Sequence, residues 1–121
     1  MDEHEMILEK RTARFAARCI NVCEAIPGNH LGSEHIKDQL FRSSTSVAAN
    51  YAEAEESESR KDFIHKMKVS MKELAETRMW LRIISECGYI ETEKLENLIE
   101  ESRQLARMMG SSVATARRNL E

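Results

Sequence analysis

Apolar residues recur along this chain at the three- and four-residue spacing of helices that bury one face. Short polar or glycine-containing stretches interrupt the pattern near residues 27–32, 57–58 and 88–91. The pattern therefore predicts helices over residues 2–26, 33–56, 59–87 and 92–119. In the third of these, the apolar stripe includes Phe63, Met67, Leu74, Leu81 and Ile84.

Local signals at the helix ends agree with this division. Ser33 and Thr92 are expected to cap the second and fourth helices. Ser59 with Asp62 resembles a capping box, and Gly88 suits the left-handed residue that follows a helix. Because the loops are short, consecutive helices should be antiparallel. We predict an all-α, up-down-up-down four-helix bundle, with residues 1–121 forming a single domain.

A stripe of polar residues follows the second helix. Counted at 100° per residue, a sector of about 80° contains Gln39, Arg42, Ser46, Asn50 and Glu53. Ser43 lies on the adjacent stripe of small and apolar residues. Polar groups at a core boundary lose water, so they must pair with one another, with another helix or with a partner molecule. The candidate interface or partner-binding residues are therefore Gln39, Arg42, Ser43, Ser46, Asn50 and Glu53.

The centre of the second helix, residues 43–47, uses serine and threonine in place of better helix formers. Small residues let a neighbouring helix approach closely, and their hydroxyls can also bind a ligand. The sequence leaves both explanations open.

The composition, 41% hydrophobic and 32% charged, is that of soluble helices with charged surfaces. No apolar run approaches the length of a bilayer span, so we expect no membrane association. The N-terminal sequence MDEHEMILEK is acidic, unlike a secretory signal, and predicts a cytoplasmic protein. Three cysteines, an odd number, indicate free thiols in a reducing compartment.

The charge distribution bears on nucleic-acid binding. A net charge of −3 argues against nucleic acid as the main partner, because phosphate contacts depend on clustered Lys and Arg. Residues 1–58 hold 6 basic and 11 acidic side chains, whereas residues 59–121 hold 12 and 10. The second half therefore leaves room for a local basic face. Candidate nucleic-acid-binding residues are Arg11, Arg14, Arg18, Arg103 and Arg107, and the simpler interpretation is that they are surface charges near glutamates.

The chain lacks the patterns typical of an enzyme. It has no glycine-rich phosphate loop and no Glu-x-x-His pair of a di-iron bundle. Ser46, His65 and a glutamate would lack an oxyanion hole. Cys19 and Cys23 are four residues apart, as two metal ligands can be, but without a nearby His or further pair they are better interpreted as small buried hydrophobes. We predict a non-enzymatic protein with no cofactor and no metal.

A specific residue pattern covers the second helix and the start of the third: Gln39-Leu40, Arg42-Ser43, Ser46-Val47, Asn50, Ala52-Glu53, then Ser59 and Asp62-Phe63. Together with Phe15 and Pro27, it resembles the four-helix bundle family encoded in intervening sequences of bacterial 23S ribosomal RNA genes. The resemblance covers nearly the whole chain. Ala54 stands where that family commonly has Gly, which predicts a less sharply broken end to the second helix.

The resemblance implies a left-handed bundle that assembles into a ring, expected to be a homopentamer. In such a ring the polar stripe could pair across subunits, with Arg42 and a carboxylate forming a bidentate pair. The family includes an accessory protein of diversity-generating retroelements, a basic ring that binds a reverse transcriptase and nucleic acid. The main prediction is therefore an oligomeric interaction scaffold. The alternatives are a nucleic-acid-binding accessory factor to an RNA or reverse-transcriptase complex and a small-molecule site in the stripe.

Overall fold

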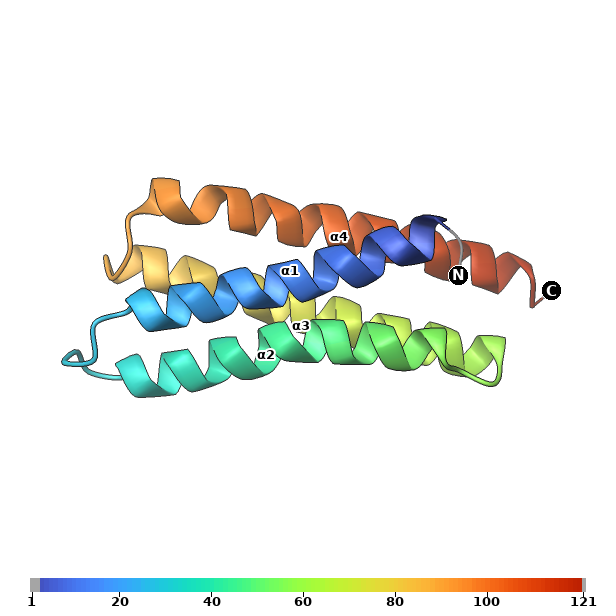
Figure 1. The fold of residues 1–121 in the computed structure, drawn as a ribbon, viewed down its shortest axis with the longest axis horizontal. Helices are drawn as coiled ribbons and strands as arrows, with labels where there is room; N and C mark the ends of the chain where they lie inside the picture. The colour runs from blue at the N-terminus through green and yellow to red at the C-terminus, as the bar shows by residue number, and fades with distance from the viewer. Residues whose placement is uncertain (1–2, 121) are drawn as a thin grey trace.

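The computed structural model describes residues 3–120, with side chains from residue 7 onward, and this part of the chain forms four long helices (Figure 1). They are α1 (Glu3–Ala25), α2 (Ser33–Glu55), α3 (Arg60–Glu86) and α4 (Thr92–Arg118). The limits differ from the predicted ones by at most one residue, because the predicted spans included capping residues. The predicted start at Asp2 lies outside the described residues.

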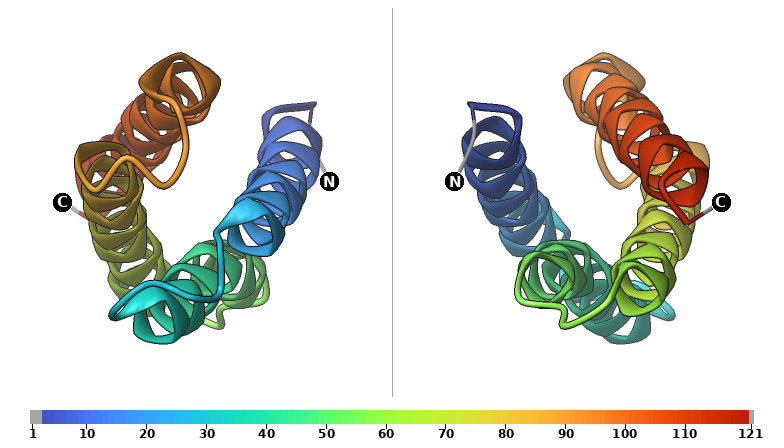
Figure 2. Two further views of the ribbon diagram at one scale, coloured as in Figure 1. Left: turned by 90° about the vertical axis from the view of Figure 1, so that its left-hand side faces the viewer. Right: turned by 90° about the vertical axis from the view of Figure 1, so that its right-hand side faces the viewer.

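Consecutive helices run antiparallel and pack against one another in chain order (Figure 1). The α2–α3 pair makes the most extensive contact, whereas α1 and α4 touch much less. Seen from either end, the helices trace a U with α1 and α4 as its arms (Figure 2). The all-α, up-down arrangement predicted from the sequence is confirmed.

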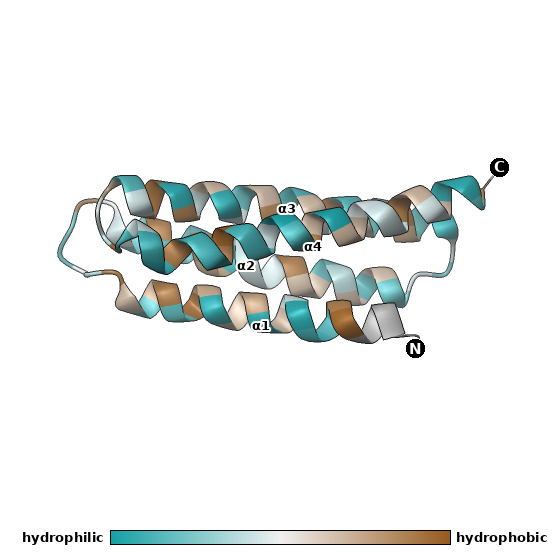
Figure 3. Ribbon diagram, turned by 90° about the horizontal axis from the view of Figure 1, so that it is seen from above, coloured by the Kyte–Doolittle hydropathy of each residue, from teal (hydrophilic) through white to brown (hydrophobic). Residues whose placement is uncertain are grey.

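The predicted apolar stripes meet in one core. Brown hydrophobic segments alternate with teal hydrophilic ones along each helix (Figure 3). The largest fully buried side chains are Leu8, Phe15, Leu40, Val47, Tyr51, Met67, Leu74, Leu81, Ile84, Leu95, Leu105 and Met109. Burying one such side chain contributes roughly 1.5–3 kcal/mol, so these residues fix how each helix is rotated and which polar residues meet at its seams.

None of the helices, over the residues that the structure describes, has a stretch long and apolar enough to cross a membrane.

The helix starts follow the predicted signals only in part. At α3, Ser59 Oγ accepts the Asp62 amide hydrogen at 3.1 Å, which confirms the cap. The caps predicted at Ser33 and Thr92 are wrong, because both residues already lie inside their helices. Before α2, the cap position belongs to Gly32, whose φ of 77° turns the chain in a way that a serine would resist.

One end of the bundle is held together by contacts between its two loops. Gly88, with φ of 72°, ends α3 as predicted, and its amide donates to the Ser85 carbonyl at 3.0 Å. The next residue, Tyr89, donates its hydroxyl to the Leu31 carbonyl at 3.0 Å and stacks on His30 with ring centroids 5.0 Å apart. The loop before α2 is therefore fastened to the loop before α4.

Candidate functional site

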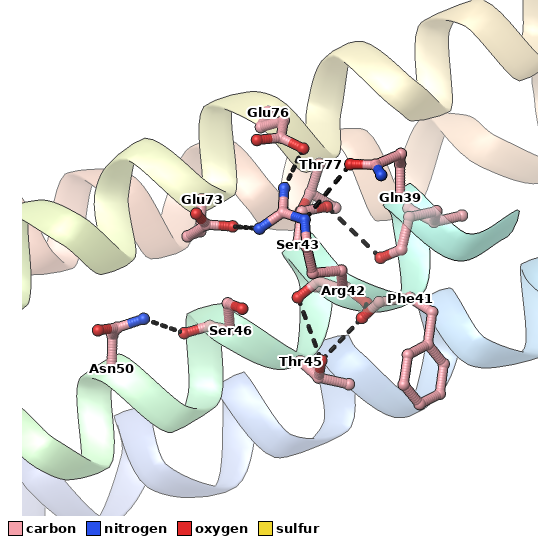
Figure 4. A network of polar contacts seen from close by, with 12 residues as sticks. Gln39, Phe41, Arg42, Ser43, Thr45, Ser46, Asn50, Glu73, Glu76 and Thr77 are labelled. Carbon is pink, nitrogen blue, oxygen red and sulfur yellow. Dashed lines mark hydrogen bonds and ion pairs between the residues drawn. The ribbon is translucent and has the colours of Figure 1, made fainter. Parts of the chain in front are cut away.

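The candidate polar stripe follows the seam between α2 and α3, with Arg42 at its centre (Figure 4). Arg42 Nη1 donates to Glu73 at 3.0 Å, Nη2 pairs with Glu76, and Nε donates to Gln39 at 3.3 Å. Both carboxylates belong to α3 of the same chain. Arg42 therefore has two ion-pair partners within its own chain.

Electrostatic effects in this network favour the charged state of its members. The hydrogen bond to Glu76 is the main reason that the pKa of Arg42 is raised. The pKa of Glu76 is held below its ordinary value of 4.5, first by the hydrogen bond from Trp80 Nε1 at 2.9 Å and then by Arg42. The side chains of Arg42 and Glu76 are 45% and 39% exposed, so each ion pair contributes only about 0.2–1 kcal/mol.

Deeper in the same seam, small hydroxyl residues bring the two helices together. Ser43, Ser70 and Thr77 are completely buried. Thr77 Oγ1 donates to Ser43 Oγ at 2.8 Å, and Ser70 Oγ donates to the Val47 carbonyl at 2.7 Å. Of the two explanations for the serine-rich centre of α2, the structure shows the close helix crossing, in which hydroxyl groups hydrogen-bond to the facing helix.

Two further stripe residues, Asn50 and Glu53, also have partners nearby. Asn50 Nδ2 donates to the Ser46 carbonyl at 2.9 Å, within α2. Glu53 accepts a hydrogen bond from Lys66 Nζ of α3 at 3.0 Å. Over the described residues, no buried side-chain nitrogen or oxygen lacks a hydrogen-bond partner. Most side chains of the stripe therefore have partners within their own chain.

The arginines predicted to bind nucleic acid lie in separate places. Arg11 Nη2 donates to Glu101 at 2.5 Å and links α1 to α4. Arg103 and Arg107 instead share Glu100 of their own helix, at 3.4 and 3.0 Å. At 100° per residue, Arg103 lies about 200° around α4 from Glu101, so the two groups occupy different flanks of that helix.

The other two predicted arginines, Arg14 and Arg18, lie on α1, exposed and half-buried respectively. Neither forms an ion pair with any side chain that the structure describes. They remain available on the surface of α1.

The pattern-based prediction missed an arginine pair on α3. Arg78 is half-buried, and its Nε donates to Ser102 Oγ of α4 at 2.9 Å. The pKa of Arg78 is lowered from its ordinary value, first by burial and then by the positive charges of Arg103 and Arg82. Arg78 and Arg82 are four residues apart beside the apolar stripe of α3, so the face counting used for α2 could have found them.

A groove of about 860 Å³ lies between α3 and α4 next to this arginine pair. It is lined by Met79, Arg82, Ile83, Ser85, Glu86, Cys87, Thr92, Glu96, Asn97, Ile99, Glu100 and Arg103. Its volume is in the range of small-molecule sites. The groove is therefore a second candidate site, separate from the α2–α3 seam.

The cysteines of α1 are buried within the bundle. Burial, followed by the neighbouring Cys23, raises the pKa of Cys19 to about 12, so its thiol stays neutral. Cys23 contacts the Lys37 carbonyl with its sulfur at 3.5 Å. Among the described residues, no three His, Cys, Asp or Glu side chains cluster where they could hold a metal ion. The pair is packed as small hydrophobic residues are.

Comparison with known protein families shows to which family the chain belongs. The family model of the 23S rRNA-intervening sequence protein matches residues 4–111. The chain belongs to this family. This confirms, at the level of family, the resemblance based on the Gln39–Phe63 pattern.

A solved structure supports the fold of this 23S rRNA-intervening sequence family member. It is a protein with unknown function from the S23 ribosomal protein family of Bacteroides thetaiotaomicron. The two share 30% sequence identity with a TM-score of 0.81, over 92% of this chain and 98% of that chain. No curated protein matches the chain. Membership in the family thus establishes the fold and relationship, without a molecular activity.

Proposed function

We propose that this chain is a non-enzymatic interaction scaffold that assembles with copies of itself through the outer face of α1 and α2. The observation that carries the proposal is Phe41, an aromatic residue that is 51% exposed in the middle of α2. Its side chain points away from the Arg42 network (Figure 4). A large aromatic side chain that the monomer leaves half in water favours burial against a partner.

Mostly short apolar side chains surround Phe41, and the charged Lys37 lies one turn before it on α2. Counting at 100° per residue places short apolar side chains on the same flank of the α1–α2 seam, and all are exposed, half-buried or at the surface edge. We call this surface the alanine face: Ala13, Ala17, Ile20, Phe41, Ala48 and Ala52. Because alanine side chains are short, the backbone of a second helix can approach this surface closely.

The alanine face replaces the polar stripe as the proposed interface. Arg42 and Glu53 already have ion pairs on α3, so a neighbouring subunit would gain little from contacting them. Family resemblance implies five subunits in a ring. A ring requires a heterologous contact, so the alanine face would pack against a different surface of the next subunit.

Native mass spectrometry of the purified protein, together with its melting temperature, tests this proposal. Wild-type protein should form a closed oligomer, and Phe41→Glu should give monomers that keep the helical content of the wild type, because a charge cannot be buried in an apolar contact. Leu31→Glu is the matched control, since Leu31 is 98% exposed in a loop and should leave assembly unchanged. A monomeric wild type, or a Phe41→Glu variant that still assembles, would contradict the proposal.

Nucleic-acid binding as an accessory factor is the second candidate. It is supported by Arg14 and Arg18, which lie on one flank of α1 and pair with no carboxylate among the described side chains. RNA binding measured across salt concentrations checks it. If both arginines contact phosphates, the double variant Arg14→Gln/Arg18→Gln should lower the log–log salt slope by about 1.4 to 1.8. An unchanged slope would leave the scaffold as the only proposal.

A further inference from the structure

The guanidinium groups of Arg82 and Arg103 line the α3–α4 groove, and that of Arg78 lies near both. Glutamates line the groove too, but among the described residues only Glu100 forms an ion pair with any of these three arginines. Arg78 binds the neutral hydroxyl of Ser102 at 2.9 Å. Arg82 has no ion pair with any side chain that the structure describes, and Arg103 reaches Glu100 only at 3.4 Å. Glu100 is itself shared with Arg107 at 3.0 Å.

Such a cluster is unfavourable for the unliganded protein. A half-buried charge loses hydration, and neighbouring like charges add repulsion. Both effects act on Arg78, whose pKa they lower. An anion placed among the three arginines would remove the repulsion and supply acceptors for their open N–H groups.

The groove also limits what kind of anion fits. Glu86, Glu96 and Glu100 line it together with Arg82 and Arg103. A chain of phosphates laid along the groove would place negative charges against these three glutamates, which opposes nucleic acid at this position. A single compact oxyanion can contact the arginines without meeting all three carboxylates.

The lining also includes three apolar side chains, beside the polar Ser85, Thr92 and Asn97. Met79 is 56% exposed, while Ile83 and Ile99 lie in the groove wall. An apolar group attached to the anion would cover these side chains and gain affinity from the area it buries.

We infer that the α3–α4 groove binds a ligand with one oxyanion, a carboxylate or a phosphomonoester, joined to an apolar body. The oxyanion binds among Arg78, Arg82 and Arg103, and the apolar body lies against Met79, Ile83 and Ile99. This site is separate from the alanine face and does not depend on self-assembly.

The exposed thiol of Cys87, which lines the groove, provides the readout. Its reaction with a disulfide reagent is followed in the presence of hexanoate, hexyl phosphate, uncharged hexanol or a single-stranded oligonucleotide, with Cys87→Ser identifying the signal. Hexanoate or hexyl phosphate should slow the reaction in a saturable way, and the stronger of the two identifies the oxyanion. Equal protection by hexanol, stronger protection by the oligonucleotide, or no protection by any probe would overturn the inference.

Variants then test the role of the arginines. Arg78→Gln should weaken protection by the anionic probe about tenfold, the loss expected for one charge-assisted hydrogen bond. Arg82→Gln, at an exposed position, repeats the test if Arg78→Gln folds poorly. Arg117→Gln, exposed in the last turn of α4, is the control and should bind as the wild type does. Wild-type affinity in both groove variants would contradict the assignment.

Discussion

Arg42 and Arg78 belong to adjacent helices, yet their surroundings are opposite. The side chain of Arg42 is 45% exposed and has two carboxylates and an amide oxygen as partners. Arg78 is half-buried and has one neutral hydroxyl, with two further arginines near it. The more accessible arginine is thus the better paired one, which reverses what stability alone would favour.

The comparison separates a structural seam from a candidate binding seam. Between α2 and α3, small residues allow close approach and every buried polar side chain has a partner. Between α3 and α4, the helices leave a groove lined by two arginines and three glutamates, and Arg82 has no ion pair with any side chain that the structure describes. Unfavourable charge in a monomer is typical of binding sites, where a ligand supplies the missing interactions.

The largest effect on the free energy of unfolding is expected from placing a larger side chain in the α2–α3 seam. Ser43→Leu should lower the free energy of unfolding by about 3 kcal/mol, because a larger side chain cannot fit at this fully buried crossing and Thr77 loses its acceptor. Chemical denaturation measures the change. Ser111→Leu, exposed on α4, is the matched control and should have little effect. Equal stability of the two variants would show that the crossing is not tight.

A smaller effect on the free energy of unfolding is expected from removing a charge of the ion pairs beside that crossing. Glu76→Gln should lower the free energy of unfolding at neutral pH by about 1 kcal/mol, since Glu76 holds both Arg42 and Trp80. Because folding lowers the pKa of Glu76, its stabilisation is present above the ordinary value of 4.5 and is lost as pH falls below it. The difference between wild type and variant should therefore shrink between about pH 5 and pH 3. A constant difference would contradict this account.

The smallest effect on stability is expected at Arg78. Arg78→Gln should leave the free energy of unfolding within about 0.5 kcal/mol of the wild type, because the lost Ser102 hydrogen bond is offset by relief of repulsion from Arg82 and Arg103. Arg42→Gln, measured in the same denaturation series, should be the less stable of the two. The reverse order would make Arg78 a structural residue and would remove the distinction between the seams.

Much of the fold could be predicted from local pattern. Helical spacing of apolar residues located all four helices, and Ser59 and Gly88 marked real helix ends. The failures at Ser33 and Thr92 have a local cause, because a glycine with positive φ or a plain extended residue can precede a helix without a side-chain cap.

The candidate site was predictable only in part. The polar stripe was recognised as needing partners, but Glu73 and Glu76 lie 31 and 34 residues from Arg42, and nothing local connects them. Face counting could have placed Arg78 and Arg82 on one flank of α3, but only the structure shows that Arg78 pairs with a neutral hydroxyl and lies near Arg103. Phe41 lies within the recognised Gln39–Phe63 pattern, but its exposure follows from the placement of α1 and α3 on either side of α2.

The amino-acid sequence by itself determined which segments are helical, which face of each is apolar and to which family the chain belongs. These properties depend on spacing within about ten residues and on a residue pattern that can be read along the chain. The tertiary structure alone decided which charges are paired. Core packing sets the rotation of each helix, and the rotation of α3 that places two glutamates against Arg42 also places Arg78 near Arg103 of α4.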